Sequence, residues 1–294
     1  MDIGRVGIWT GALDRAPYAQ AIEMASEIES LGYGAVWVPE GVGKDPLVSC
    51  ALLLAGTKTL AAATGIANIY SRDAIAMAQA HKTLTEAFPD RFVLGLGVSH
   101  RPMVEGMRGL TYEKPIATMR SYLERMDQSL YMGPEPSTAP FRVIGALRDR
   151  MMGLARELAN GAHPYNVPPE HTAHARVVLG PDKLLAPELA VTMERDPAKA
   201  REMGRAHLEI YFNLPNYTNN LRALGFTDDD FADGGSDRLV DAIVGWGSVE
   251  RIATMVREHH DAGADHVCIQ VLVPRGGSES PAVGWRELAP ALVG

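Results

Sequence analysis

The sequence predicts an α/β fold, a TIM (β/α)8 barrel with insertions, from three observations. Short apolar runs alternate with amphipathic helical patterns about eight times, the number at which a parallel sheet closes into a barrel. The runs are apolar throughout, as in strands that are covered on both faces. The length of 294 residues suits one barrel domain. An open doubly wound sheet is the alternative architecture.

The first strand–helix–strand unit is expected at the N-terminus. Residues 5–9 form a short apolar run, and apolar residues recur every three or four positions over 18–31, as one face of a helix requires. Gly32 then supplies a left-handed helix cap. The run AVWV at 35–38 predicts a buried strand.

The same alternation continues along the chain. The further expected strands are 62–69, 92–96, 141–145, 188–193 and 266–273, and the further expected helices are 73–88, 116–130, 149–159, 249–256 and 284–292. Asn160-Gly161 and Gly263 end two of these helices.

Two stretches break the alternation. Residues 162–187 are rich in Pro and His, and residues 213–247 mix turn residues with a short helical pattern. Long irregular segments in a compact domain are usually functional loops or disorder, and the aromatic residues here favour order. We therefore expect a single domain over 1–294 that carries these two insertions.

Composition excludes several classes of function. The 36 acidic and 28 basic side chains give a net charge of −8, which argues against nucleic-acid and anionic-membrane partners. The only cysteines, Cys50 and Cys268, form neither a disulfide framework nor a thiolate zinc site. The segment MDIGRVGIWTG lacks the apolar run of a signal peptide. We expect a cytoplasmic protein.

Catalytic residues of a barrel follow the strands at their carboxyl ends. Here the strand ends read Trp9-Thr10-Gly11, Pro39-Glu40-Gly41, Gly65-Ile66-Ala67-Asn68, Gly97-Val98-Ser99-His100, Gly145-Ala146-Leu147-Arg148, His163-Pro164-Tyr165, Met193-Glu194-Arg195 and Pro274-Arg275. The strands carry no Lys for a Schiff base, and they offer neither an H-x-H pair nor clustered carboxylates for a metal. Such a small, uncharged rim suits a large cofactor that supplies the chemistry.

Glycines and one arginine at this rim are candidates for cofactor contacts. Gly95-x-Gly97 is not a dinucleotide fingerprint, because His100 takes the third glycine position and no helix follows directly. Glycines at a strand end still let a ligand approach the backbone, although a tight turn would also use them. Arg148 and the helix behind it suit a phosphate, with a plain surface arginine as the alternative.

Histidines at strand ends are candidates for acid–base work. His100 and His163 both follow strands, although a lone histidine is more often packed or solvated than catalytic. His171 and His174 form an H-x-x-H in a Pro-rich loop with Glu170 as the only nearby carboxylate. This is weak evidence for a metal, and we expect none.

Several segments together resemble the luciferase-like monooxygenase superfamily, and within it the branch that uses the deazaflavin coenzyme F420. These segments are RVGIWTG, ESLGYGAVWVPE, TGIANIYSRDA, FPDRFVLGLGVSH, NLPNYTNNLRALGF and GSVERIATMVREHHDAGADHV. Their order and spacing, which cover nearly the whole chain, carry the resemblance.

The resemblance implies a luciferase-like TIM barrel, usually dimeric, that holds a flavin or deazaflavin ring at its mouth. It places a non-proline cis peptide bond at Gly65-Ile66, behind the ring. It also implies the other cofactor contacts: Trp9, Glu40 and Asn68 near the ring, Gly97, Val98 and Ser99 along the tail, and Ala146, Leu147 and Arg148 at the phosphate.

One position departs from the family's sugar-phosphate dehydrogenases, in which a His follows the acidic residue of the second strand. Here that residue is Gly41, so neither that base nor that substrate carries over. The remaining acid–base candidates are His100, which we favour, His163, Tyr165 and Glu40.

The expected function is an F420-dependent oxidoreductase that transfers a hydride between the deazaflavin and a small organic substrate. The alternatives are an FMN-dependent luciferase-like monooxygenase and a non-catalytic cofactor-binding barrel.

Overall fold

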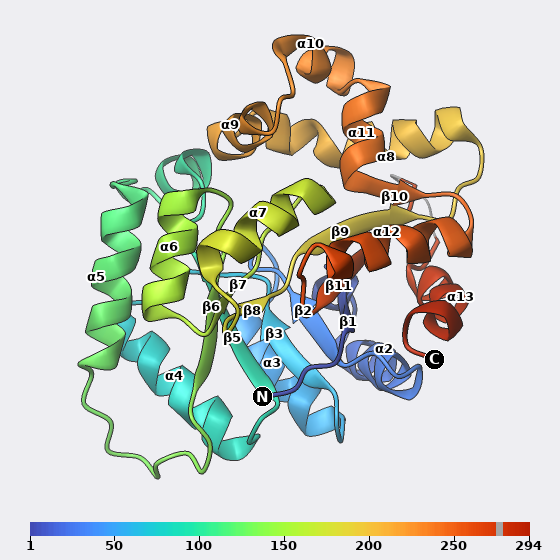
Figure 1. The fold of residues 1–294 in the computed structure, drawn as a ribbon. Coiled ribbons are helices and arrows are strands. Elements are labelled where there is room, and N and C mark those ends of the chain that lie inside the picture. The colour runs from blue at the N-terminus through green and yellow to red at the C-terminus, as the bar shows by residue number, and fades with distance from the viewer. Residues whose placement is uncertain (275–278) are drawn as a thin grey trace.

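The computed structural model describes residues 1–274 and 279–294. Its strands are β1 (Val6–Trp9), β2 (Ala35–Val38), β3 (Ala61–Thr64), β4 (Ala67–Asn68), β5 (Phe92–Gly97), β6 (Phe141–Ile144), β7 (Gly161–Ala162), β8 (Leu184–Leu185), β9 (Glu188–Thr192), β10 (Val244–Trp246) and β11 (Val267–Val271). They pair in the order β10-β9-β11-β1-β2-β3-β5-β6-β7-β8, and β4 pairs with β5. All these pairings are parallel, and Figure 1 shows the sheet curled inside a layer of helices. The α/β class and the parallel sheet are thus confirmed.

The helices cover the outside of this sheet and one of its ends. They are α1 (Ala12–Arg15), α2 (Tyr18–Ser30), α3 (Pro46–Gly56), α4 (Ala74–Ala87), the π-helix η1 (Pro102–Met107), α5 (Pro115–Asp127), α6 (Asp149–Leu158), α7 (Pro169–Leu179), α8 (Pro197–Phe212), α9 (Pro215–Ala223), α10 (Asp228–Phe231), the 3₁₀ turn η2 (Ala232–Gly234), α11 (Asp237–Ile243), α12 (Val249–Asp261) and α13 (Ala282–Leu292). In the described ranges no helix is long and apolar enough to cross a bilayer.

Alternate residues of each strand belong to two different cores. On β2, Val36 packs with the core between sheet and helices, whereas Trp37 packs with the apolar cluster inside the curled sheet. Val93 of β5 and Cys268 of β11 lie in the same inner cluster as Trp37. Side chains on both faces of the strands are therefore buried, which explains the uniformly apolar runs in the sequence.

The strand expected at 62–69 is interrupted. The chain forms β3, then a bulge at Gly65 and Ile66 joined by a cis peptide bond, and then β4. The cis bond was expected at these residues and is confirmed. The break moves Asn68 onto a register with Gly97 of β5.

Two helices were missed by periodicity. α3 has the sequence PLVSCALLLAG, so it lacks the polar face that marks an amphipathic helix. Its start is nevertheless signalled by Asp45, whose side chain accepts from two backbone N–H groups, followed by Pro46. Asp196 and Pro197 begin α8 in the same way.

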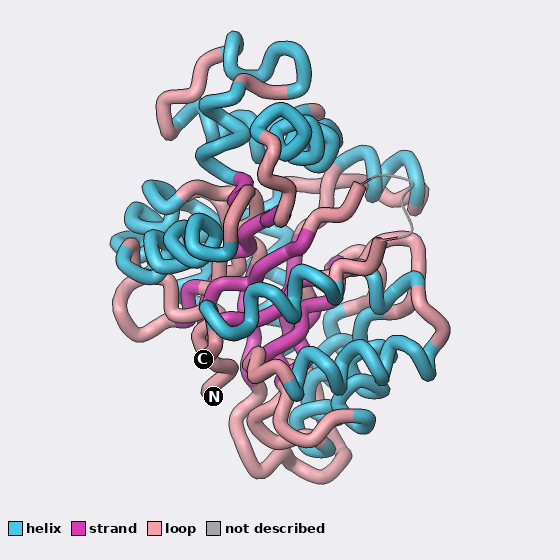
Figure 2. The backbone as a smooth tube through the Cα atoms, turned by 90° about the vertical axis from the view of Figure 1, so that its right-hand side faces the viewer, coloured by secondary structure: helices cyan, strands magenta, loops and turns pink. Residues whose placement is uncertain are grey.

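The two expected insertions contain regular structure. Residues 162–187 hold α7 and β8, and residues 213–247 hold α9, α10, α11 and β10. Helices α8 to α11, residues 197–243, form what we call the helical excursion, which begins earlier than the expected insertion, at Pro197. The excursion has its own apolar cluster, which includes Leu208, Leu221 and Leu239. Figure 2 shows these helices beyond one end of the strands, so they stand over the sheet rather than around it.

Candidate functional site

The bulge after β3 forms a wall with Trp9 at the carboxyl end of β1. The indole N–H of Trp9 donates a hydrogen bond to the carbonyl oxygen of Gly65 at 2.8 Å. A Cβ at position 65 would lie 2.8 Å from that indole nitrogen and 3.2 Å from Cβ of Trp37. The wall therefore requires glycine at residue 65.

Ile66 fills a slot lined by glycines. A Cβ at Gly97 would lie 1.8 Å from Cδ1 of Ile66, and one at Gly145 would lie 2.8 Å from the same atom. On this face of Gly97 the room is taken by the side chain of Ile66. That a ligand approaches the backbone of these strand-end glycines stays a prediction. The sequence pattern cannot distinguish these two uses of glycine.

Glu40 and Asn68 are in direct contact. The backbone N–H of Asn68 donates to Oε2 of Glu40 at 2.7 Å, and Nη1 of Arg72 lies 3.0 Å from the same oxygen. Nη2 of Arg108 lies 3.5 Å from Oε1. With its side chain only 7% exposed, Glu40 is an ionic anchor between the ends of β2 and β4. Sequence analysis missed Arg72 and Arg108, which stand outside the strand ends.

Val98, Ser99 and His100 form the turn after β5. Ser99 has φ of +55°, and the carbonyl of His100 accepts the N–H of residues that begin η1. The ring centroid of His100 lies 5.7 Å from that of Tyr217 on α9. Burial lowers the pKa of this half-buried imidazole. His100 thus stands at the mouth of the sheet, beneath the helical excursion.

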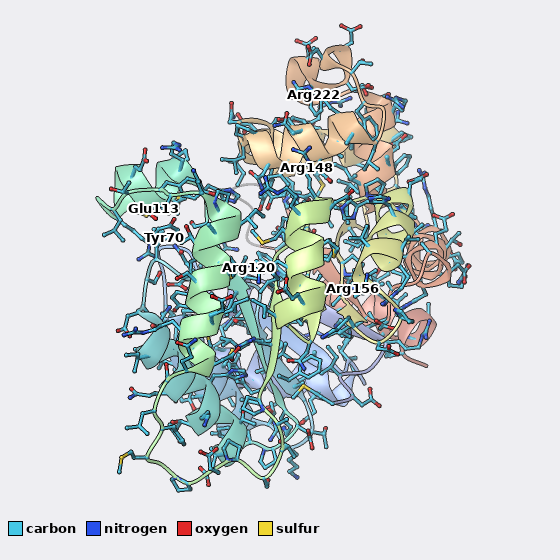
Figure 3. The ribbon with its side chains drawn as sticks, turned by 60° about the vertical axis from the view of Figure 1, so that its left-hand side comes forward. Tyr70, Glu113, Arg120, Arg148, Arg156 and Arg222 are labelled. Carbon is cyan, nitrogen blue, oxygen red and sulfur yellow. The ribbon has the colours of Figure 1, made fainter. Side chains whose placement is uncertain are left out.

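Ala146, Leu147 and Arg148 lead into α6. Nε2 of His171 donates to the carbonyl oxygen of Leu147 at 2.5 Å, which holds the loop. Arg148 is exposed and is the N-cap of α6, and no side chain caps the helix. Figure 3 shows Arg148 at the start of α6, on the side of the sheet where α8 and α9 stand. The open first turn of α6 beside an arginine can receive an anion.

His174 does not join His171 at a common site. Nε2 of His174 lies 2.7 Å from Asp149 at the surface, whereas His171 is buried against Leu147. In residues 1–274 and 279–294 no group of three or more His, Cys, Asp or Glu is arranged to hold a metal ion.

His163 is enclosed and does not face the mouth as expected. It is 3% exposed, its ring is stacked on Trp37 with centroids 4.5 Å apart, and its Nδ1 donates to the carbonyl of Ala186 at 2.7 Å. Burial lowers the pKa of His163 to about 4, so the imidazole is neutral. Its catalytic role stays a prediction that this enclosure does not favour.

Tyr165, Tyr211 and Tyr217 lie together over Trp9. Sequence analysis identified Tyr165 and missed the other two. Ring centroids are 5.4 Å apart for Trp9 and Tyr165, 5.4 Å for Tyr165 and Tyr211, and 4.9 Å for Tyr211 and Tyr217. Tyr165 follows β7, whereas the other two come from α8 and α9 of the excursion. The spacing of His207 and Tyr211, four apart on one helix face, is a signal that could have indicated this cluster.

A buried carboxyl group lies beneath the tyrosines. Glu188 is fully buried at the first position of β9, and its Oε2 accepts the backbone N–H of Asn166 at 3.1 Å. Burial raises the pKa of Glu188 to about 8. Its Oε1 and Nδ2 of Asn166 have no partner among the described residues. The sequence signal for this buried carboxyl group is a glutamate at the start of the apolar run ELAVT.

The arrangement presents neutral hydrogen-bonding groups beside a wall of backbone and indole. Glu40, the carboxylate nearest the wall, is held in ion pairs, and His100, Tyr165 and Glu188 are neutral groups. Arg275, at the end of the last expected strand, lies outside the described residues. Such a site can orient a substrate and exchange protons with it, and the redox or group-transfer chemistry has to come from a bound cofactor.

Comparisons with known proteins agree with this architecture. A coenzyme F420-dependent oxidoreductase by name, from Mycobacterium tuberculosis, is 27% identical over 161 residues, which cover 54% of this chain and 46% of that protein. The 5,10-methylenetetrahydromethanopterin reductase of Archaeoglobus fulgidus is 28% identical over 151 residues, covering 45% of each chain. The alignments span about half the length of these curated relatives.

Solved structures share the fold over almost the whole chain. An F420-dependent secondary alcohol dehydrogenase in complex with an F420-acetone adduct superposes with a TM-score of 0.77 at 14% identity, over 98% of both chains. The oxygenating constituent of 3,6-diketocamphane monooxygenase from Pseudomonas putida, in complex with FMN, gives a TM-score of 0.70 at 14% identity, over 98% of this chain and 96% of that one. The family model described as luciferase-like monooxygenase matches residues 4–266. The chain belongs to the luciferase-like monooxygenase family.

Proposed function

We propose that this protein is an F420-dependent oxidoreductase that transfers a hydride between the deazaflavin and a small organic substrate. The observation that carries the proposal is the wall that Trp9, Gly65 and Ile66 form, with the neutral side chains of His100 and Tyr165 at the same end of the sheet. Two relatives support the choice of cofactor, because one is named for coenzyme F420 and one structural neighbour contains it. The deazaflavin supplies hydride chemistry and reacts little with oxygen.

The residues fit such a cofactor at both of its ends. The wall of Trp9 and the bulge offers a flat apolar surface for the ring, with Asn68 and the anchored Glu40 at its edge. The tail would follow Gly97, Val98 and Ser99, and the phosphate would meet the loop 146–148. Arg148 and the uncapped first turn of α6 match a phosphate in charge and in hydrogen-bond donors.

The acid–base residues of the reaction are proposed among the predicted candidates. His100 lies at the mouth, against Tyr217, where a substrate above the ring would reach it. Glu40 is better suited to holding the strand ends than to proton transfer, because two arginines and a backbone N–H occupy its carboxylate.

We infer that the sheet closes as a barrel through residues 184–192. β8 pairs with β7, β9 pairs with β11, and Ala186 donates its N–H to the carbonyl of Ala162. Closure would fix the positions of the strand ends around the mouth.

A homodimer is proposed on the outer face of α2 and α3. Val48 and Leu52 lie four residues apart on α3 and are 57% and 39% exposed, and Tyr18 on α2 is 48% exposed. An exposed apolar surface of this kind is typical of a protein interface. Light scattering after size-exclusion chromatography should give a dimer for the wild-type chain and a monomer for Val48→Glu/Leu52→Glu. A wild-type monomer contradicts the dimer.

Parallel titrations test the proposed function. The protein is titrated with F420 and with FMN, and binding is followed by absorbance and by quenching of cofactor fluorescence. We expect F420 to bind with a Kd of about micromolar or tighter, and FMN to bind more weakly. Tighter binding of FMN would instead support the FMN-dependent monooxygenase, and F420 binding without turnover of any acceptor would support a non-catalytic cofactor-binding barrel.

A further inference from the structure

Two of the tyrosine hydroxyl groups over Trp9 form a directed hydrogen-bond chain that ends on Gln270. The hydroxyl of Tyr211 donates to the hydroxyl oxygen of Tyr165 at 3.1 Å, and the hydroxyl of Tyr165 donates to Oε1 of Gln270 at 2.6 Å. Gln270 belongs to β11 and Tyr211 to the last turn of α8, so the sheet and the excursion hold Tyr165 from two sides. A phenol that is fixed in this way keeps one orientation without further ordering.

Tyr165 is also placed over the cofactor wall. Its ring lies 5.4 Å from that of Trp9, at an interplanar angle of 60°, and Trp9 in turn holds the carbonyl of Gly65. A substrate that bound beside this wall, under the helices α8 and α9, would have the Tyr165 hydroxyl as its neighbour. His100 stands farther along the ring of aromatics, beyond Tyr217.

The charge state of the cluster suits donation rather than removal of a proton. Burial raises the pKa of Tyr165 and of Tyr217 well above the usual value and that of Tyr211 to about 12. Burial also raises the pKa of Glu188, below them, to about 8. At neutral pH these four groups are protonated, and a protonated group acts as an acid.

We propose that Tyr165, held between Tyr211 and Gln270, donates the proton in the reduction of a carbonyl compound, so that the protein works as a reductase. This proposal rests on the proposed function. The reductant is the reduced deazaflavin. The C=O π bond breaks, the carbonyl carbon gains a C–H bond from the hydride, and the oxygen gains an O–H bond from the Tyr165 phenol, whose proton turns from Oε1 of Gln270 to the bound carbonyl oxygen. Two electrons move to the substrate and the product is an alcohol.

The chain of hydroxyls then restores the donor. The phenolate of Tyr165 takes the proton of Tyr211, whose hydroxyl is 3.1 Å away. Tyr211 is half-buried and recovers its proton from solvent water. Bound reduced F420 would supply the hydride and return one proton to solvent, so that two hydrogens would pass overall from the cofactor to the carbonyl.

The first experiment detects the hydrogen bond from Tyr165 to a bound ketone in the absence of turnover. The infrared carbonyl band of ¹³C-labelled cyclohexanone is recorded on the wild-type protein loaded with oxidised F420, and on Tyr165→Phe and Tyr211→Phe. We expect the wild type and Tyr211→Phe to shift the band of the bound ketone to lower frequency. Tyr165→Phe should return the band to its unbonded position. The same unshifted band in all three proteins would overturn the proposal.

The second experiment measures proton transfer. Reduced F420 is mixed with cyclohexanone in a single turnover and its oxidation is followed by absorbance. Tyr165→Phe is expected to lower the rate by about 10²-fold or more and to abolish the solvent deuterium isotope effect of the wild type. Tyr211→Phe should leave the single-turnover rate close to that of the wild type and lower the steady-state rate, because Tyr211 only returns a proton to Tyr165 after the reaction. The matched control is Tyr131→Phe, whose hydroxyl lies near Thr83 and outside the cluster.

The outcomes separate this proposal from the proposed function. If the wild type does not bind F420, the proposed function fails. If F420 binds with the same Kd to wild type and Tyr165→Phe, and both proteins shift the carbonyl band and react at equal rates, only the role of Tyr165 fails. If Tyr165→Phe does not fold, an unshifted carbonyl band in the wild type overturns the role of Tyr165, and a full steady-state rate in Tyr211→Phe contradicts the relay.

Discussion

Oγ1 of Thr172 lies 2.9 Å from Nδ1 of His259, and this contact joins α7 to α12 where both residues are fully buried. Nε2 of His259 has no partner among the described residues. Burial lowers the pKa of His259 to about 3, so the folded protein holds a neutral imidazole there. Burial likewise lowers the pKa of His81, His163 and His266 to about 4.

These histidines predict a loss of stability in mild acid. An unfolded histidine titrates near pH 6.5, so below about that pH the unfolded chain binds protons that the folded chain excludes. The free energy of unfolding should be highest above about pH 6.5 and fall toward about pH 4, by up to about 1.4 kcal/mol per pH unit for each histidine. Urea titrations at several pH values measure this slope. His259→Gln should reduce the slope, because it removes one of these neutral buried imidazoles. A flat profile would contradict the prediction.

Glu40→Gln should destabilise the protein by about 2 kcal/mol or more. The amide leaves Arg72 and Arg108 without their shared carboxylate, and a partly buried charge that loses its partner is costly. Urea denaturation measures the change. The control is Glu157→Gln, which breaks the exposed pair with Arg120 and should have little effect. Equal effects of the two substitutions would show that Glu40 is no anchor.

Gly97→Ala should lower the free energy of unfolding, measured by urea denaturation. It should also weaken F420 binding, measured by titration, because Gly97 lies along the proposed path of the cofactor tail. The added Cβ would meet Cδ1 of Ile66, and forcing an extra methyl group into such a space costs about 1–3 kcal/mol. The double variant Gly97→Ala/Ile66→Ala should recover stability, because it empties the slot. Gly153→Ala on α6, where a Cβ would meet nothing within 4 Å, is the control and should stabilise slightly. If the double variant does not recover stability, contact with Ile66 is not the cause of the loss in Gly97→Ala.

Arg148→Glu should weaken F420 binding by about tenfold or more, which corresponds to about 1.4 kcal/mol. The substitution places a negative charge at the N-terminus of α6, where the phosphate is proposed to bind. Arg156→Glu reverses the same charge near the other end of α6 and should leave the affinity unchanged (Figure 3). Equal losses in both variants would indicate a general electrostatic effect rather than a phosphate site.

The fold could be predicted from the sequence where each element has a local signal. The strands at Val6–Trp9 and Ala35–Val38 and the helix at Tyr18–Ser30 follow from apolar runs and helical periodicity. α3 escaped because an all-apolar helix has no period, and its cap, Asp45 followed by Pro46, was the available signal.

The candidate site was predictable only on the side formed by the strand ends. Trp9, Gly65 and Asn68 follow strands of the sheet; Trp9 and Gly65 are hydrogen-bonded, and Asn68 is in register with Gly97. Tyr211 and Tyr217 reach the same mouth from helices far along the chain, through packing that no local pattern encodes. The position of Glu188 near the tyrosines could not be predicted for a related reason: the sequence does not show which side chains pack against each face of a strand.

The separate apolar cluster of α8–α11 has an evolutionary consequence. Leu208, Leu221 and Leu239 give these helices an apolar cluster of their own. We therefore expect substitutions on the helical side of the proposed site to leave the strands of the proposed cofactor wall undisturbed. The two sides of the proposed site would then be under separate selection. We expect chimaeras that exchange residues 197–243 between family members to inherit substrate preference from the donor of the helices and cofactor preference from the donor of the sheet.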